Sequence, residues 1–142
     1  MPLSSEECQQ FLAEPHIGAL SVAEGAERGP LTVPIWYQYT PGAQLWVLTG
    51  PESAKMRRIR AAGRFSLMVE RTAPTVRYVS VEGPVTAVEP TTEAQHREMV
   101  ERYLPPHQVD EYLAFAEAEL GAQVTVFLRP ERWLSADMGH FG

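Results

Sequence analysis

Five basic side chains lie close together in a chain that is otherwise acidic. The protein has 142 residues, with 12 basic and 18 acidic side chains and a net charge of −6. Lys55, Arg57, Arg58, Arg60 and Arg64 nevertheless fall within ten residues, and Lys55 is the only lysine of the chain. A positive island on a negative protein indicates a local site for an anion, and it argues against a general surface for nucleic acid.

The residues before and within this island predict the start of a helix that can bind an anion. Thr49 can cap the helix, and Glu52 follows it at the spacing of a capping box. Ser53 then lies in the first turn, where backbone N–H groups have no partner and favour a phosphate. Lys55 and Arg58 are three residues apart and therefore share one face. The alternative is an ordinary basic helix face in solvent.

Apolar spacing along the whole chain predicts a protein with more strand than helix. In the basic helix, Met56 and Ile59 are expected to face the core, and Gly63 ends the helix. Strands are predicted at residues 16–23, 31–40, 44–49, 64–71, 76–88 and 122–128. Further helices are predicted at residues 4–14 and on both sides of Pro105-Pro106, and the tail after residue 128 is expected to be irregular.

Short turns join these strands, which favours an antiparallel sheet. Six short strands of this kind tend to close into a barrel, because closure removes exposed edges. At 142 residues, with no linker that would divide the chain, we expect one domain over residues 1–142. The predicted fold is therefore mixed α+β and mainly β, with a six-stranded antiparallel split barrel.

Other chemistry has little support in the sequence. The histidines His16, His96, His107 and His140 show no metal-ligand spacing, and we expect each to be structural. Cys8 is alone and is expected to pack on a helix rather than act as a nucleophile. No apolar run can span a bilayer and no signal peptide is visible, so we expect a cytoplasmic protein without membrane contact. An enzyme with so little acid–base machinery needs a cofactor that carries the chemistry, such as a flavin with its terminal phosphate.

Several short motifs resemble those of one known family. A strand ending in V-L-T is followed, after three residues, by S-A-K and the basic helix. This order resembles the FMN-phosphate segment of the pyridoxamine 5′-phosphate oxidase-like split β-barrels, a family that includes flavin- and deazaflavin-dependent oxidoreductases. Leu48, Thr49, Ser53 and Lys55 occupy the positions of that motif. Residues 31–37 are similar to the family's strand along the flavin ring, and V-E-G-P-V at residues 81–85 is similar to a later strand motif.

The resemblance implies a homodimeric oxidoreductase that binds FMN between its subunits and passes hydride to or from a small organic substrate. The implied cofactor contacts are Val33, Pro34, Ile35, Trp36, Val47, Leu48, Thr49, Ser53, Lys55, Met56, Arg58, Tyr78 and Trp133. Within this set, Thr49, Ser53, Lys55 and Arg58 are expected to hold the phosphate, and residues 33–36 and 47–49 to flank the ring. Large aromatic side chains on the same strands, among them Trp36, Tyr37 and Trp46, are expected at the subunit interface, with the barrel core as the alternative for the tryptophans.

The sequence also departs from the pattern of the true pyridoxamine phosphate oxidases. Leu31, Tyr37 and Tyr78 stand where those enzymes carry an arginine, a lysine and a glutamine. Arg132-Trp133 is only a faint echo of their C-terminal signature. We therefore do not expect pyridoxamine phosphate as the substrate. A flavin or deazaflavin carrier of the same fold, without turnover, is the alternative function.

The choice of cofactor depends on the remaining cations. FMN ends at one phosphate, whereas the deazaflavin coenzyme F-420 continues into a phosphodiester and an acidic tail. Arg57, Arg60, Arg64 and Arg77 could hold such a tail, or they could simply balance nearby carboxylates such as Glu82. FMN is expected on the strength of the phosphate motif, with the deazaflavin as the close alternative.

Overall fold

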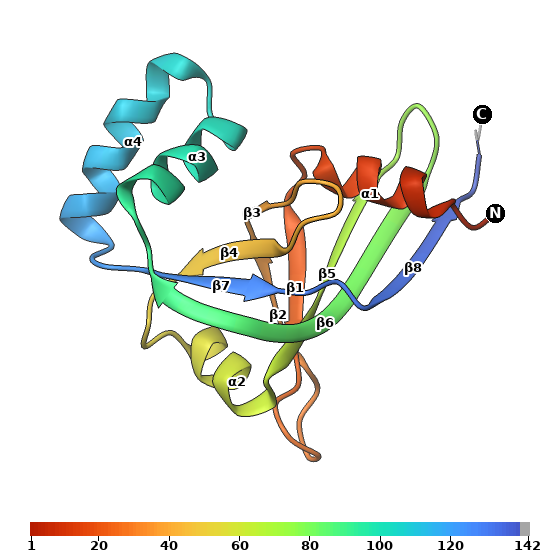
Figure 1. Ribbon diagram of the computed structural model, residues 1–142, viewed down its shortest axis with the longest axis horizontal. Helices are drawn as coiled ribbons and strands as arrows, with labels where there is room; N and C mark the ends of the chain where they lie inside the picture. Colours follow the sequence, from red (N-terminus) through yellow and green to blue (C-terminus); the bar gives the residue numbers. More distant parts are fainter. Residues whose placement is uncertain (140–142) are drawn as a thin grey trace.

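The computed structural model describes residues 1–139 and contains four helices and eight strands within them (Figure 1). The helices are α1 (Ser5–Ala13), α2 (Ala54–Ala62), α3 (Glu93–Tyr103) and α4 (Pro106–Glu119). The strands are β1 (Gly18–Val22), β2 (Leu31–Ile35), β3 (Tyr37–Gln38), β4 (Leu45–Thr49), β5 (Arg64–Arg71), β6 (Arg77–Pro90), β7 (Val124–Leu128) and β8 (Arg132–Asp137). The predicted α+β class with a curled antiparallel sheet is confirmed. No helix in this part of the chain is long and apolar enough to cross a membrane.

Two segments account for the difference between six predicted strands and eight observed ones. The strand predicted over residues 31–40 is broken into β2 and β3, with Trp36 between them. The tail, predicted to be irregular, contains β8, which pairs with the first half of β6 from Glu82↔Arg132 to Arg77↔Asp137. His140 lies outside the described residues.

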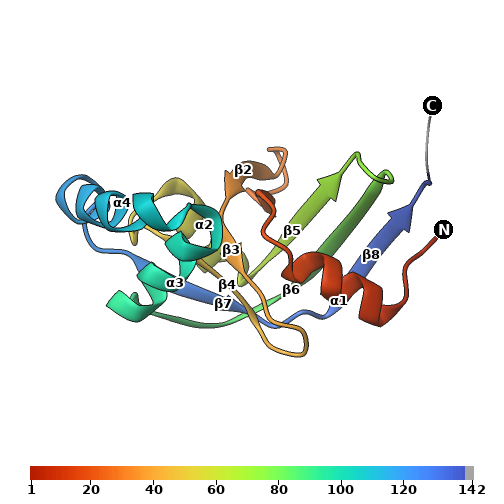
Figure 2. The same ribbon diagram turned by 90° about the horizontal axis from the view of Figure 1, so that it is seen from above.

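Every strand pairing is antiparallel, and one long strand belongs to both halves of the sheet. β6 pairs with β5 and β8 through its first half and with β7 through its second. The hydrogen-bonded order is β2-β1-β5-β6-β7-β4-β3, with β8 on β6. The two ends of this order, β2 and β3, are consecutive in the chain. The covalent chain, rather than a ladder of hydrogen bonds, therefore closes the barrel, and the break between β2 and β3 is the split (Figure 2).

β6 can serve both halves because its backbone passes very close to the β7–β8 connection at Gly83. Arg129 N–H donates to Pro84 O at 3.0 Å, and Glu131 N–H donates to Glu82 O at 3.0 Å. A Cβ on Gly83 would lie 1.9 Å from Arg129 O. Since real side chains do not tolerate such a contact, this crossing requires glycine.

Helix α1 covers one end of the barrel and is held there by two long side chains (Figure 1). Tyr37 donates its hydroxyl hydrogen to Leu12 O at 2.6 Å, and its ring is fully buried. Arg102 from α3 donates to Ala13 O at 2.8 Å and to Glu14 O at 2.9 Å. These bonds satisfy carbonyl groups at the end of α1. Tyr37 is therefore part of the core, not of an exposed interface.

At the split, the first backbone N–H after the strand break donates a hydrogen bond to a side chain of helix α3. Tyr37 N–H donates to the hydroxyl of Tyr103 at 3.1 Å, and that hydroxyl donates to His16 O at 2.7 Å. The Trp36 ring stacks on Tyr103, with ring centroids 4.9 Å apart, and lies 5.5 Å from the ring of Tyr112 on α4. Helices α3 and α4 are thus attached directly over the opening between β2 and β3.

The end of β8 is anchored by one carboxylate. Asp137 accepts hydrogen bonds from Thr75 Oγ1 at 2.7 Å, from Gly139 N at 2.8 Å and from Arg77 Nε at 2.8 Å. These bonds, with that from Thr75 the largest cause, lower the pKa of Asp137 from 3.8 to about 2. The carboxylate therefore ties β8 to the β5–β6 hairpin more strongly when it is ionised.

We expect Gly83→Ala to destabilise the fold by about 1 to 3 kcal/mol or more, the usual cost of overpacking, because the methyl group meets backbone that cannot rotate away. Urea unfolding followed by circular dichroism measures the change. Gly29→Ala is the matched control, since its Cβ would meet nothing within 4 Å. Equal losses in the two variants would show that the crossing at Gly83 is not a constraint.

We expect Asp137→Asn to remove part of the acid sensitivity of the fold. A carboxylate whose pKa is lowered in the folded state stabilises that state above its unfolded pKa, and this contribution is lost as the pH falls from about 3.8 to about 2. The free energy of unfolding of the wild type should fall more steeply over this window than that of the variant. Asp110→Asn, at an exposed partner of Arg97, should keep the wild-type slope. A wild-type slope in Asp137→Asn would refute the assignment.

Candidate functional site

Helix α2 begins at Ser53 rather than at Thr49. Ser53 is the N-cap, and its Oγ accepts the Met56 N–H at 3.1 Å. The capping box predicted from Thr49 and Glu52 does not form, because a turn separates the end of β4 from the helix. The helix ends at Gly63, as predicted, with φ at 73°. Thr49 Oγ1 lies 2.9 Å from Ser53 Oγ, so two hydroxyl groups meet where β4 ends and α2 begins.

Lys55 extends back to these two hydroxyl groups. Its Nζ donates to Thr49 Oγ1 at 2.9 Å. The side chain is half-buried, and burial lowers the pKa of the ammonium group. No carboxylate within residues 1–139 pairs with it. Since a charge removed from water normally has a partner of opposite sign, the arrangement of Lys55, Thr49 and Ser53 indicates a site for a phosphate or another anion.

The neighbouring arginines have other partners. Arg58 Nε lies 3.3 Å from Glu24 Oε1, in the β1–β2 loop. Arg57 donates to the backbone carbonyl of Glu52 at 2.6 Å. Arg64 pairs with Glu82, on β6. The predicted face shared by Lys55 and Arg58 is therefore divided, with Lys55 turned toward β4 and Arg58 toward the loop.

A groove of about 440 Å³ opens beside Lys55 at the split, and we call it the split groove. The barrel side of its wall is formed by Pro34, Ile35, Trp36, Leu48 and Lys55, and the remaining lining residues are Ile17, His96, Met99, Val100, Tyr112 and Gln123. Its size is within the range of small-molecule sites, and its lining is mainly apolar with a few polar groups. We call the place where Lys55, Thr49 and Ser53 meet the Lys55 corner. The wall of the groove suits a flat aromatic ring system with an anionic end at this corner.

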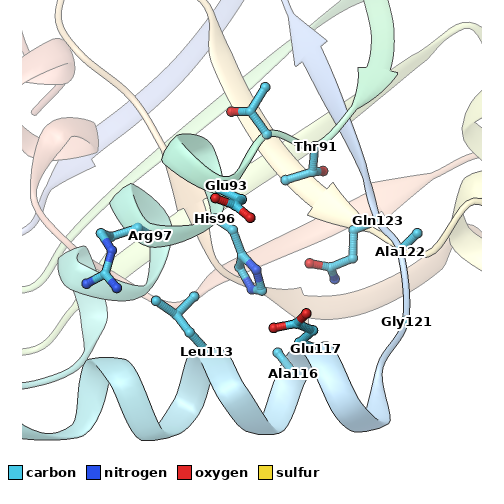
Figure 3. Close-up of a pocket in the computed structure, with 11 residues that line it drawn as sticks. Thr91, Glu93, His96, Arg97, Leu113, Ala116, Glu117, Gly121, Ala122 and Gln123 are labelled. Carbon is cyan, nitrogen blue, oxygen red and sulfur yellow. The ribbon is translucent and has the colours of Figure 1, made fainter.

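A second cavity, of about 470 Å³, lies between α3, α4 and the segment that leads into β7, and we call it the helix cavity (Figure 3). Its lining residues are Thr91, Thr92, Glu93, His96, Arg97, Leu113, Ala116, Glu117, Gly121, Ala122 and Gln123. His96 and Gln123 line both spaces. The split groove and the helix cavity therefore adjoin at these two side chains.

The structure brings together a central part of the predicted site. Pro34, Ile35, Trp36, Leu48 and Lys55 all line the split groove. Thr49 and Ser53 join them through the hydrogen bonds around Lys55. These seven residues come from β2, the break after it, β4 and the start of α2, so the split itself positions them.

Other predicted residues lie away from the split groove. Val47 and Met56 are fully buried in the core, and Val33 packs against the core. Tyr78 is on β6 opposite Glu70 and Ala136. Trp133 packs edge-on against Tyr39, with ring centroids 6.1 Å apart. Neither Tyr78 nor Trp133 lines the groove of its own chain.

Sequence reasoning missed the helical part of the wall. Met99 and Val100 have the spacing of a buried helix face, but that spacing does not say what the face covers. Tyr112 likewise has the spacing of an apolar helix face, Gln123 carried no signal, and His96 was expected to be structural. These residues become neighbours only when α3 and α4 fold back over the split.

Comparisons with known proteins agree with this architecture. The sequence profile described as pyridoxamine 5′-phosphate oxidase matches residues 4–136. A search of curated proteins found no match. Among solved structures, the conserved hypothetical protein Rv2991 from Mycobacterium tuberculosis is similar over 99% of this chain and 91% of its own, with 26% identity and a TM-score of 0.74.

Two further structures are similar in fold. One is described as an F420 reductase, with 22% identity, a TM-score of 0.70, and coverage of 88% of this chain and 94% of its own. The other is a FAD-binding protein from Mesorhizobium loti, with 21% identity, a TM-score of 0.66, and coverage of 98% of each chain. The profile match spans almost the whole chain, and the split barrel agrees with it. The chain therefore belongs to the pyridoxamine 5′-phosphate oxidase-like family of split β-barrels.

Proposed function

We propose that the protein is an oxidoreductase that binds FMN in the split groove and passes hydride to or from a small organic substrate. The observation that carries this proposal is Lys55: a half-buried ammonium group, bonded to Thr49 and close to Ser53, without a carboxylate partner in residues 1–139 and in the wall of a mainly apolar groove. A flavin supplies the hydride chemistry when it is bound, so the protein has only to hold and orient it.

In this proposal the Lys55 corner holds the phosphate. The ammonium group, the hydroxyls of Thr49 and Ser53, and the free N–H groups at the start of α2 act together. A unit charge pair at about 4 Å gains roughly 4 kcal/mol at an effective dielectric constant of 20, before desolvation is subtracted. The backbone and side chains of Pro34–Trp36 and Leu48 flank the ring, and Arg58, bonded to Glu24, contributes only at longer range.

The cations outside this corner favour FMN over the deazaflavin coenzyme. Of the arginines considered for an acidic tail, Arg64 is paired with Glu82, and Arg77 with Asp137. Arg57 is bonded to a backbone carbonyl. Arg60, exposed on α2, remains as a candidate for such a tail. The deazaflavin stays the alternative cofactor, and a carrier without turnover stays the alternative function; a steady-state assay with reduced cofactor separates the carrier from the enzyme.

We further propose a homodimer formed through one face of the wide sheet. The strand register places mainly uncharged side chains opposite to the core on β2, β1, β5, β6 and β8, together with Glu70 and Glu82. The uncharged ones are Thr32, Pro34, Ala19, Ser21, Ser66, Met68, Tyr78, Ser80, Leu134 and Ala136. We call this surface the outer sheet face. Ile17, 58% exposed, and Leu134, 55% exposed, are large apolar groups in solvent here. Tyr78 lies on this face and away from the split groove of its own chain. In the proposed dimer, the Tyr78 that approaches a bound cofactor would come from the second copy.

We expect Lys55→Ala to weaken FMN binding by about 1.5 to 3 kcal/mol, or roughly 10- to 150-fold in Kd, the scale of a hydrogen bond to a charged group. The affinity of the wild type should also fall as salt is added, since the site is open to solvent. Isothermal titration calorimetry measures both effects. Arg60→Ala, on the same helix, is the control and should leave FMN affinity nearly unchanged. If Lys55→Ala binds FMN as tightly as the wild type, the phosphate is not held at this corner.

We expect light scattering to give twice the chain mass of 15.9 kDa at micromolar concentration. Leu134→Glu should shift the mass toward the monomer, because it places a charge in the apolar interface. Phe115→Glu is the matched control, since Phe115 on α4 is 51% exposed but lies off the outer sheet face. A wild-type monomer, or a monomer from both variants, would count against this surface as the interface.

A further inference from the structure

His96 occupies the boundary between the split groove and the helix cavity. It lies on the first half of α3, and its ring points into the space between α3, α4 and Gln123 (Figure 3). It is the titratable side chain common to the linings of both spaces, since the other shared residue is Gln123. A proton on His96 is therefore accessible from either side.

The surroundings of His96 leave its ring free to exchange a proton. Burial is the cause that lowers the pKa of its imidazole, and no ion pair with a carboxylate contributes. The charged groups that face it are Glu93 and Arg97 from α3 and Glu117 from α4, with Lys55 across the split groove. Arg97 is bonded to Asp110 at 2.8 Å. The ring can thus gain or lose a proton without breaking a side-chain hydrogen bond or an ion pair within residues 1–139.

The other titratable groups of the split groove are less suited to this role. Lys55 is bonded to Thr49 and belongs to the Lys55 corner, where the phosphate is proposed to bind. Tyr112 packs between Trp36 and Phe115, at 5.5 and 6.2 Å between ring centroids. His96 is left as the imidazole of the split groove, the type of side chain that most often exchanges protons in catalysis.

We propose that His96 is the proton-exchanging residue of the split groove, which takes up a proton when the bound cofactor is reduced and gives it to the substrate. This inference rests on the proposed function. Protonated His96 donates to the substrate atom next to the carbon that receives hydride; its N–H bond breaks and a new bond to hydrogen forms on that atom. The substrate would gain one hydride, which a reduced flavin supplies with its two electrons, and one proton, which His96 supplies. The neutral ring regains a proton from water through the helix cavity when the cofactor is next reduced.

The test measures how the protonation of His96 is coupled to the redox state of bound FMN, and it needs no substrate. The midpoint potential of FMN bound to the full-length protein is determined from about pH 5.5 to about pH 8 for the wild type, His96→Gln and His107→Gln. The control residue, His107, is exposed on α4 and lines neither space. In a plot of midpoint potential against pH, we expect the wild type and His107→Gln to change slope near the pKa of His96. We expect His96→Gln to lack this change of slope.

A second measurement makes the result independent of the variant's folding. The pKa of His96 is followed by NMR in the wild type with oxidised and then reduced FMN, and we expect it to rise on reduction by about half a unit or more, equivalent to about threefold in proton affinity. The role of His96 would be overturned if the midpoint potential had the same pH dependence in all three proteins. It would also be overturned if the pKa of His96 were the same with oxidised and reduced FMN. Either result would leave FMN binding intact. Failure of the wild type to bind FMN would instead refute the proposed function, and the inference with it.

Discussion

The hydroxyl group of Tyr103 holds the split together. The strand that begins at Leu31 cannot continue past Trp36, and its next N–H, on Tyr37, would otherwise be left without a partner next to the core. Tyr103 accepts that N–H and donates to the carbonyl of His16, so one side chain from α3 joins two segments of the barrel. The stacking of Trp36 on the same ring fixes the side-chain direction at the break. Helix α3 is positioned by these contacts, and with it the helical wall of the split groove.

The same helix connects the two cavities. The residues of α3 that face the barrel, such as Met99 and Val100, line the split groove, while Glu93 and Arg97 line the helix cavity. His96 lies between the two sets and contributes to both. Arg102 reaches the end of α1 from the last turn of α3, so Arg102 and Tyr103 both hold the C-terminal end of this helix. Near its start, Gln95 accepts a hydrogen bond from Thr125 Oγ1, on β7, at 3.0 Å. His96 lies between these contacts, next to Gln95.

The half-buried cation at the start of α2 differs from the arginines around it, because it has no carboxylate partner within residues 1–139. The arginines on and after α2 are largely taken up by carboxylates and carbonyls of the barrel, as with Arg58 and Glu24 or Arg64 and Glu82. Such exposed ion pairs contribute little to stability. An arginine that is paired in this way attracts a bound anion less strongly than an unpaired cation does. Lys55 differs because it is half-buried and bonded only to a neutral hydroxyl among residues 1–139. In three dimensions the basic island of the sequence is therefore divided into arginines paired with the barrel, such as Arg58 and Arg64, and one half-buried ammonium group.

The sequence by itself determined the features that depend on near neighbours. The class of the fold, the burial of Met56 and Ile59, the end of α2 at Gly63 and the approach of Thr49, Ser53 and Lys55 all follow from spacing within a few residues. Only the tertiary structure decided the break at Trp36, since the period-two pattern of residues 31–40 runs through it without interruption. It also decided that β8 is a strand, because its partner β6 lies far upstream. The position of His96 at a boundary was decided in the same way. Its surroundings come from α4 and the segment before β7 as well as from α3, and no local pattern can report on walls that distant segments supply.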